Sequence, residues 1–353
     1  MPPVISVWEL YDLVFAFFLW LSIVACGLFL VVAGVVSASV YRLAKEPAPS
    51  RRSVLSAVCL LALLVHHAHG ENLKVPLGLD LYLPVPEQNP LTPEKIELGR
   101  RLFFDRRLSH DGSIACASCH DPERGFSDGR PVAIGVYGRQ GRRNAPTLIN
   151  RGYGRSFFWD GRVSSLEDQV LKPIQDPNEM DMPLSDAADR VGLAPEEISR
   201  ALASYVRSIL SGDSPFDRFI NGDRSALSAE QQAGLQLFRG KANCIACHVG
   251  PNFTDEKLHN TGVAWRDGRF ADAGAGEGKF KTPTLREIVL TAPYMHDGSI
   301  ATLEEVVGYY DRGGNRNPGL DQEIRPLHLS STEKQNVIAF LRGLHGTTNE
   351  AGR

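Results

Sequence analysis

Two apolar runs lie at the N-terminal end of the chain. Residues 10–40 are almost continuously apolar, which is long enough for a helix to cross a bilayer. The positive-inside rule predicts that the basic segment at residues 41–53 is cytoplasmic. The shorter run at residues 54–65 has the layout of a secretory signal. Either cleavage near Gly70 or retention as a second anchor therefore places the remaining chain outside the cytoplasm.

After residue 70 the pattern changes to separate amphipathic helices. Apolar residues recur at helical spacing in residues 92–104, 193–210 and 330–346. Thr92 is the expected N-cap of the first helix, and Gly346 the expected end of the third. The long segments between them are rich in glycine and proline and lack the alternation typical of strands. The pattern predicts a mostly α fold with long loops.

The overall composition adds little to the predicted fold, but the positions of the cysteines are informative. The 353 residues are 43% hydrophobic and 22% charged, which is typical of a globular protein and leaves room for about two domains. The net charge of -3 gives no reason to expect binding to nucleic acid. Of the six cysteines, Cys26 and Cys59 lie in the apolar runs, and the other four form two pairs. No cysteine is left for a disulfide framework.

Each of these pairs is followed directly by a histidine. The two motifs are Cys116-Ala-Ser-Cys119-His120 and Cys244-Ile-Ala-Cys247-His248. Two cysteines three positions apart can form thioethers to the vinyl groups of one haem, and the histidine then binds the iron. Zinc ligands would lie closer together, and neither zinc nor a thioredoxin-like pair requires a histidine after each second cysteine. The sequence therefore predicts two haem c groups.

The surroundings of the two motifs are related. Residues 97–128 and 233–255 share a helix with Leu-Phe near its end, the haem motif, and then Phe-Ser-Asp or Phe-Thr-Asp. Such self-similarity indicates two copies of one cytochrome-like unit. Turn-forming residues at 211–215 separate the copies. The predicted organisation is a membrane and signal region, a first haem domain and a second haem domain, at residues 1–70, 71–212 and 213–353.

Further motifs occur at residues 143–147 (RNAPT), 158–162 (FWDGR), 169–180 (QVLKPIQDPNEM) and 290–298 (LTAPYMHDG). With the two haem motifs, they make residues 92–344 resemble the bacterial diheme cytochrome c peroxidases, and within these the MauG-like branch. The resemblance implies two cytochrome c-like haem domains and an enzyme that activates hydrogen peroxide at the first haem.

The resemblance also implies roles for single residues. Glu179 is similar to the distal acid that moves a proton between the two oxygens of peroxide. Gln169 and Pro173 match the other residues of the distal pocket, and Trp159 matches an aromatic residue that relays electrons between the haems. A calcium ion between the domains is implied at the position of Asn144 and the carbonyl groups of Thr291 and Pro293.

The first haem is expected to keep an open coordination position. In many family members a loop histidine blocks this haem at rest, and here no histidine lies between His120 and His248. The resemblance to the MauG-like branch therefore implies a five-coordinate iron that needs no reductive activation. His110, just before the first motif, is expected to lie at the surface or near a propionate.

The second haem is expected to have a sixth ligand. Peroxidases of the family use a methionine after the LEEVV helix, but this chain has no methionine after Met295. Tyr310 lies at the matching place, and MauG-like members use tyrosine there. Tyr310 is the favoured ligand, with Met295 as the alternative. His296 is expected near a haem propionate, with Arg286 as its charged companion.

Three functions remain open at this point. One is a periplasmic peroxidase, attached to the inner membrane, that takes electrons from a cytochrome c or a cupredoxin. Another is a MauG-like oxidase that modifies a partner protein. The resemblance places a tryptophan two positions before the second motif as the electron exit of such an oxidase, but Ala242 occupies that position. The third is an electron carrier without catalysis.

Overall fold

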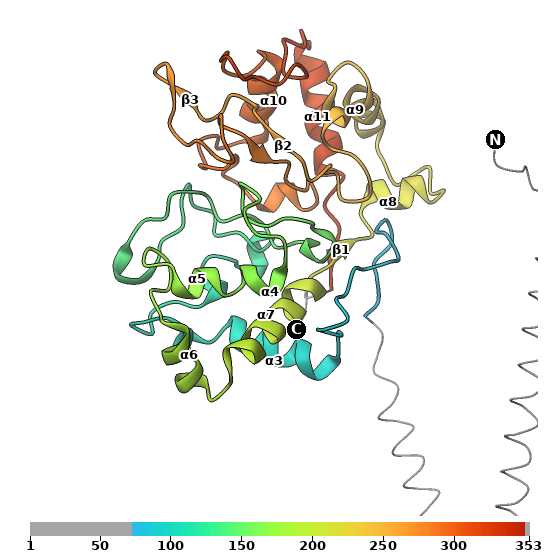
Figure 1. Cartoon of the computed structure of the whole chain (residues 1–353). Coiled ribbons are helices and arrows are strands. Elements are labelled where there is room, and N and C mark those ends of the chain that lie inside the picture. Colours follow the sequence, from blue (N-terminus) through green and yellow to red (C-terminus); the bar gives the residue numbers. More distant parts are fainter. Residues whose placement is uncertain (1–72, 350–353) are drawn as a thin grey trace, which may run out of the picture. The chain divides into compact units, whose positions relative to one another are not determined.

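Helices and long loops, with very little sheet, make up residues 73–349, which the computed structural model describes (Figure 1). This confirms the predicted mostly α fold. The expected membrane and signal segments in residues 1–70 lie outside the described residues. Within the part that is described, no helix combines the length and the apolar character that a membrane span requires.

The helices are short, and each strand has two residues. The α-helices are α3 (Pro93–Phe103), α4 (Leu166–Gln169), α5 (Lys172–Gln175), α6 (Leu184–Val191), α7 (Pro195–Ser208), α8 (Pro215–Ile220), α9 (Ala229–Arg239), α10 (Leu303–Asp311) and α11 (Ser331–Arg342). The strands are β1 (Ser211–Gly212), β2 (Leu258–His259), β3 (Trp265–Arg266), β4 (Arg269–Phe270), β5 (Phe280–Lys281) and β6 (Thr347–Thr348). They pair antiparallel as β1 with β6, β2 with β5, and β3 with β4.

The three helices expected from the sequence are α3, α7 and α11. Thr92 caps α3, because its hydroxyl accepts a hydrogen bond from the Lys95 amide at 3.3 Å. Helix α11 ends with Gly343 as its C-cap, three residues before the expected Gly346. The Gly346 amide instead donates a hydrogen bond of 2.8 Å to the carboxylate of Glu287, next to the β1–β6 pair. The helix thus ends earlier than the sequence pattern predicted, and Gly346 takes part in a tertiary contact.

The helix that precedes each haem motif packs on a later helix in the same way. Helix α3 packs on α7, and α9 packs on α11 (Figure 1). A Cβ atom on Gly99 of α3 would lie 1.9 Å from the carbonyl oxygen of Ala201. A Cβ atom on Gly234 of α9 would lie 1.9 Å from the carbonyl oxygen of Asn336. Glycine at corresponding positions therefore allows both pairs of backbones to approach closely.

Each half has its own cluster of buried apolar side chains. The first cluster includes Phe103 and Tyr205, whose ring centres are 5.0 Å apart. The second includes Phe238 and Phe340, whose ring centres are 5.1 Å apart. The first cluster draws only on residues before Gly212, and the second only on residues after it. The two helix pairs thus each bury an apolar core of their own.

Candidate haem-binding site

Both Cys-x-x-Cys-His motifs face one large cavity. Its volume is about 1220 Å³, and its walls come from the first half and the second half of the described chain. This exceeds the range of roughly 300–1,000 Å³ that is usual for one small-molecule site. The motif residues that line it are Cys119, His120, Cys244, Cys247 and His248. The remaining cysteine, Cys116, packs against the first apolar cluster.

The two histidines are held in the same way. Each motif begins as a single 3₁₀ turn, Cys116–Ser118 in the first and Cys244–Ala246 in the second. Nδ1 of His120 lies 3.0 Å from the carbonyl oxygen of Phe126, and Nδ1 of His248 lies 2.8 Å from that of Phe253. These bonds fix the tautomer with the proton on Nδ1, which leaves Nε2 free to bind a metal.

Burial also lowers the pKa of both histidines, which favours the neutral ring that iron requires. Two neutral imidazoles with a free Nε2, each beside two cysteine thiols in one oversized cavity, fit the chemistry of two haem c groups.

The residues expected in the distal pocket of the first haem all line the part of the cavity that is formed by the first half of the chain. Gln169 ends α4, Pro173 belongs to α5, and Glu179 follows in the next loop; all three line the cavity. The amide of Met180 donates to the carbonyl oxygen of Pro173 at 3.1 Å, and the amide of Val136 donates to that of Glu179 at 2.8 Å. These two bonds fix the backbone on both sides of the acid.

Glu179 is a carboxyl group with a strongly altered acidity. Burial, with a smaller contribution from the nearby charge of Asp176, raises the pKa of Glu179 to about 7. A proton can therefore enter or leave this carboxyl group near neutral pH. Among titratable groups in a cavity, such a value is characteristic of acid–base catalysis.

Trp159 lines the cavity, and hydrogen bonds fix both its side chain and its backbone. Its indole Nε1 donates to the carbonyl oxygen of Asn144 at 2.9 Å, and its own carbonyl oxygen accepts from the Lys281 amide at 2.7 Å. The Asn144 amide donates in turn to the carbonyl oxygen of His296 at 2.8 Å. Thr291 and Pro293 line the same cavity as these residues.

Both candidates for the sixth ligand of the second haem line the cavity. They are Tyr310 of α10 and Met295 in the loop before α10. Burial raises the pKa of Tyr310, so its phenol stays protonated unless a cation is close by. The neighbouring Tyr309 is not among the lining residues, and its hydroxyl donates to the carbonyl oxygen of Thr261 at 2.9 Å.

His296 and Arg286, which were expected together near a haem propionate, have different contacts. His296 lines the cavity, where its ring stacks on Phe280 with centres 3.7 Å apart. Arg286 is outside the set of lining residues and donates to the carboxylate of Asp217 at 2.9 Å and to the carbonyl oxygen of Pro251 at 2.7 Å. Both members of the Arg286–Asp217 pair are fully buried, and a role of Arg286 near a haem propionate stays a prediction.

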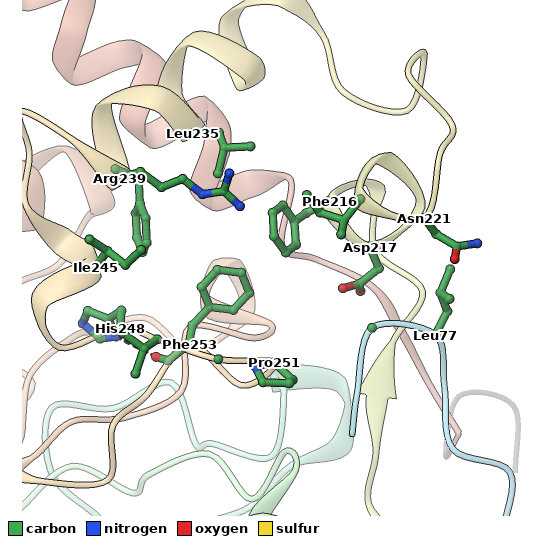
Figure 2. A pocket seen from close by; sticks show the side chains of 15 residues that line it. Leu77, Phe216, Asp217, Asn221, Leu235, Arg239, Ile245, His248, Pro251 and Phe253 are labelled. Carbon is green, nitrogen blue, oxygen red and sulfur yellow. Dashed lines mark hydrogen bonds between the residues drawn. The ribbon is translucent and has the colours of Figure 1, made fainter. Parts of the chain in front are cut away.

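A smaller pocket lies beside the second motif (Figure 2). Its volume is about 490 Å³, and it shares His248 and Phe238 with the large cavity. Its lining is mostly apolar and includes Phe216, Leu235 and Phe253.

The charged groups around the cavity were not predicted from the sequence. Arg143 bridges Asp160 and Asp272, with N–O distances of 2.7 and 2.8 Å. Arg143 and Asp160 lie inside motifs already recognised, and they were the available signal, whereas Asp272 is 129 positions from Arg143. His259 was also missed. Its two ring nitrogens bond to the carboxylates of Asp321 and Asp255, which favour the protonated, positively charged ring beside the second motif.

Comparisons with known proteins agree with this geometry. The family model described as di-haem cytochrome c peroxidase matches residues 93–225. The chain is 41% identical over 286 residues to the methylamine utilization protein MauG of Methylorubrum extorquens, covering 74% of this chain and 81% of that one. It is 34% identical over 289 residues to the cytochrome c551 peroxidase of Nitrosomonas europaea, covering 74% and 83%.

A solved structure extends the likeness to three dimensions. The crystal structure of a MauG-like protein associated with microbial copper homeostasis matches with a TM-score of 0.69 and 36% identity, over 76% of this chain and 94% of that one. Together with the cavity that both haem motifs face, these similarities show that the chain belongs to the family of di-haem cytochrome c peroxidases.

Proposed function

We propose that this chain is an exported peroxidase that reduces hydrogen peroxide at a first haem c and takes up electrons through a second. When bound, each haem supplies reversible one-electron chemistry at iron and, where a coordination position is open, a site for peroxide. The residues that would hold the two groups are Cys116, Cys119 and His120 for the first, and Cys244, Cys247 and His248 for the second.

The buried carboxyl group of Glu179, in the cavity that His120 also lines, carries this proposal. With a pKa of about 7, Glu179 can accept a proton from the peroxide oxygen nearer to the iron and deliver it to the far oxygen, which leaves as water. Gln169 and Pro173 complete this side of the pocket. A protein that only transfers electrons has no use for a proton-transfer group beside an open iron, which speaks against a plain carrier.

Electrons are proposed to reach the first haem by way of Trp159. The support is its place on the cavity wall and the hydrogen bonds that fix its indole and its backbone. Tyr310 is the proposed sixth ligand of the second haem, with Met295 as the alternative, and both line the cavity. A phenolate ligand would stabilise oxidised iron and lower the potential of that haem.

We also propose a calcium site formed by the side chain of Asn144 and the carbonyl groups of Thr291 and Pro293. All three residues line the cavity, and oxygen ligands of this kind suit a hard cation. The side-chain nitrogen of Asn144 donates to the carbonyl oxygen of Arg130 at 2.7 Å, which directs the amide oxygen away from that bond. Because Trp159 donates to the Asn144 carbonyl oxygen, a cation here would also stabilise the indole.

The two halves, residues 71–212 and 213–353, are proposed as the haem domains. Support comes from their separate apolar clusters and matching helix pairs. Export to the periplasm, with the N-terminal segments as anchor to the inner membrane, rests on the apolar runs at residues 10–40 and 54–65. The proposed electron donor is a small redox protein of that compartment.

Electron paramagnetic resonance of the purified ferric holoprotein tests the proposal. We expect one high-spin signal, from the open first haem, and one low-spin signal, and only the high-spin signal should disappear when peroxide is added. Reduced cytochrome c should then be oxidised in a peroxide-dependent reaction. Two low-spin signals that do not change when peroxide is added would instead identify an electron carrier.

The second candidate is a peroxide-dependent oxidase that modifies a partner protein. The 41% identity to a methylamine utilization protein favours it. Against it, Ala242 occupies the place of the tryptophan expected for the electron exit, and it is buried in the cavity wall. Rapid turnover with cytochrome c would favour the peroxidase, and a reaction with peroxide that no small redox protein accelerates would favour the oxidase.

A further inference from the structure

A tyrosine and a histidine form an exposed pair beside the loop of the distal acid. The hydroxyl oxygen of Tyr137 lies 2.5 Å from Nδ1 of His110. Tyr137 is 55% exposed, and it lies in the 3₁₀ turn Val136–Gly138 with a positive φ of 57°. Residues other than glycine rarely adopt this conformation, and their presence in it often marks a functional constraint.

Both members of the pair are fixed to the backbone of the acid loop. The His110 amide donates to the carbonyl oxygen of Met180 at 2.9 Å, and the amide of Val136, next to Tyr137, donates to that of Glu179 at 2.8 Å. Gly135 allows this close approach, because a Cβ atom there would lie 2.1 Å from the carbonyl oxygen of Asn178. The pair is therefore held in a fixed position next to the acid.

The same turn also reaches the first haem motif. Sγ of Cys119, which would carry a thioether to the first haem, lies 4.0 Å from the carbonyl oxygen of Ile134. Tyr137 follows Ile134 by three residues, so their Cα atoms are at most about 11 Å apart. The turn that carries Tyr137 thus follows directly on a contact with a cysteine of the first haem motif, and the phenol itself is exposed at the protein surface.

We propose that Tyr137, with His110 as its proton acceptor, is a surface site at which small phenols or aromatic amines are oxidised one electron at a time. The inference rests on the proposed peroxidase function, because hydrogen peroxide supplies the oxidising equivalents. Its basis is the short O–N contact, since a phenol gives up an electron far more easily when its proton moves at the same time to a base.

With hydrogen peroxide and the first haem as the oxidant, Tyr137 would lose one electron, and its hydroxyl proton would pass to Nδ1 of His110, which leaves a neutral tyrosyl radical. A phenol in solution then gives one electron to the radical, the proton returns from His110, and the phenol loses its own proton to water. Two such cycles consume one hydrogen peroxide, with the two protons taken up, and yield two water molecules and two phenoxyl radicals.

The chain offers a matched control for this site. Tyr82 is 75% exposed, so its phenol is even more accessible than that of Tyr137, but it does not belong to the turn beside the acid loop. Tyr137→Phe removes the oxidisable hydroxyl, Tyr82→Phe removes one elsewhere, and His110→Gln keeps a hydrogen-bonding side chain but removes the base.

The experiment uses the full-length holoprotein, hydrogen peroxide, a nitroso spin trap and 2-methoxyphenol as the probe. We expect a spin adduct on the peptide that contains Tyr137 in the wild type and in Tyr82→Phe, much less in His110→Gln, and none in Tyr137→Phe. Oxidation of 2-methoxyphenol should fall about tenfold in Tyr137→Phe. Haem content and peroxide-dependent oxidation of cytochrome c should not change in that variant.

The outcomes separate this inference from the proposed function. If peroxide is consumed with cytochrome c but no adduct forms on Tyr137, or if Tyr137→Phe oxidises 2-methoxyphenol at the wild-type rate, the surface site is wrong and the peroxidase stands. If the wild type consumes no peroxide under any condition, both are wrong.

Discussion

At the scale of single residues, Glu179 holds its carboxyl group where burial makes a negative charge unfavourable. We predict that Glu179→Gln keeps both haems but slows the reaction with peroxide by about 10²–10⁴-fold, because the amide fills the same space and cannot accept a proton. Stopped-flow mixing of the ferric holoprotein with peroxide measures this rate. The matched control is Glu123→Gln, which changes an exposed glutamate outside the cavity lining. Equal rates in wild type and Glu179→Gln would remove Glu179 from the chemistry.

The same carboxyl group predicts a pH profile. Because burial raises the pKa of Glu179 to about 7, the group is protonated below that pH and ionised above it. Only the carboxylate can accept the proton of peroxide, so the rate constant should fall about tenfold for each pH unit below 7 and be level above it. Glu179→Gln should have a low rate without this slope. A profile in wild type that is flat between pH 5 and 8 would contradict the assignment.

The two candidate ligands of the second haem can be told apart by substitution. We predict that Tyr310→Phe changes the low-spin spectrum and raises the potential of the second haem, because an anionic ligand is lost. Met295→Leu should leave both properties as they are. Tyr309→Phe is the control, since it removes a neighbouring phenol that bonds to Thr261 and does not line the cavity. A changed low-spin spectrum in Met295→Leu alone would make Met295 the ligand.

At this scale, the sequence predicted the residues of a site where they are neighbours in the chain. The cysteines and the histidine of each motif are adjacent because one haem needs all three, and their spacing alone predicted the two sites. Arg286 shows the limit, since its partner Asp217 precedes it by 69 positions and no local pattern links them. The charge beside Cys247 depends in the same way on Asp321, which lies 62 positions after His259.

At the scale of elements, two glycines set the distance between packed helices. Gly99 and Gly234 each face a backbone carbonyl group of the partner helix, and a Cβ atom would lie 1.9 Å from its oxygen. We predict that Gly99→Ala and Gly234→Ala each lower the free energy of unfolding by about 1–3 kcal/mol, because a backbone group cannot move aside cheaply. Thermal unfolding of the holoprotein measures the effect.

Gly308 of α10 is the matched control for these two substitutions. A Cβ atom there would lie 3.5 Å from the side-chain nitrogen of Arg312, an ordinary contact. Gly308→Ala should therefore raise stability by about 0.5–1 kcal/mol through helix propensity alone. Stabilisation by Gly99→Ala of the same size would show that the α3–α7 contact is not tight.

The elements themselves were largely predictable, but their ends and partners were not. Apolar periodicity and the Thr92 cap located α3, α7 and α11. The end of α11 was placed too late because Gly346, a good helix terminator in isolation, bonds to Glu287 in the tertiary structure. The two-residue strands β1 to β6 are too short to leave an alternating pattern.

At the scale of the whole molecule, the two halves have separate apolar clusters but share one large cavity. The residues that line it range from Cys119 in the first half to Leu341 in the second. Both halves therefore form its walls. Protein interiors are close-packed, so a space of about 1220 Å³ between the two apolar clusters indicates that bound groups complete the packing. The haem groups are therefore expected to form the central part of the folded core.

We predict that the polypeptide without haem unfolds at a much lower temperature than the holoprotein and is cut rapidly by protease. Haem-free chain is obtained by replacing all four motif cysteines with serine, and circular dichroism and limited proteolysis compare it with the wild type. Cys116→Ser with Cys119→Ser removes one attachment site and Cys244→Ser with Cys247→Ser the other, and each pair should give an intermediate melting temperature. Because the cavity is continuous, either pair should also weaken the half that keeps its haem. If the fully substituted chain had the same melting temperature as the wild type, the haems would contribute nothing to the stability of the folded core.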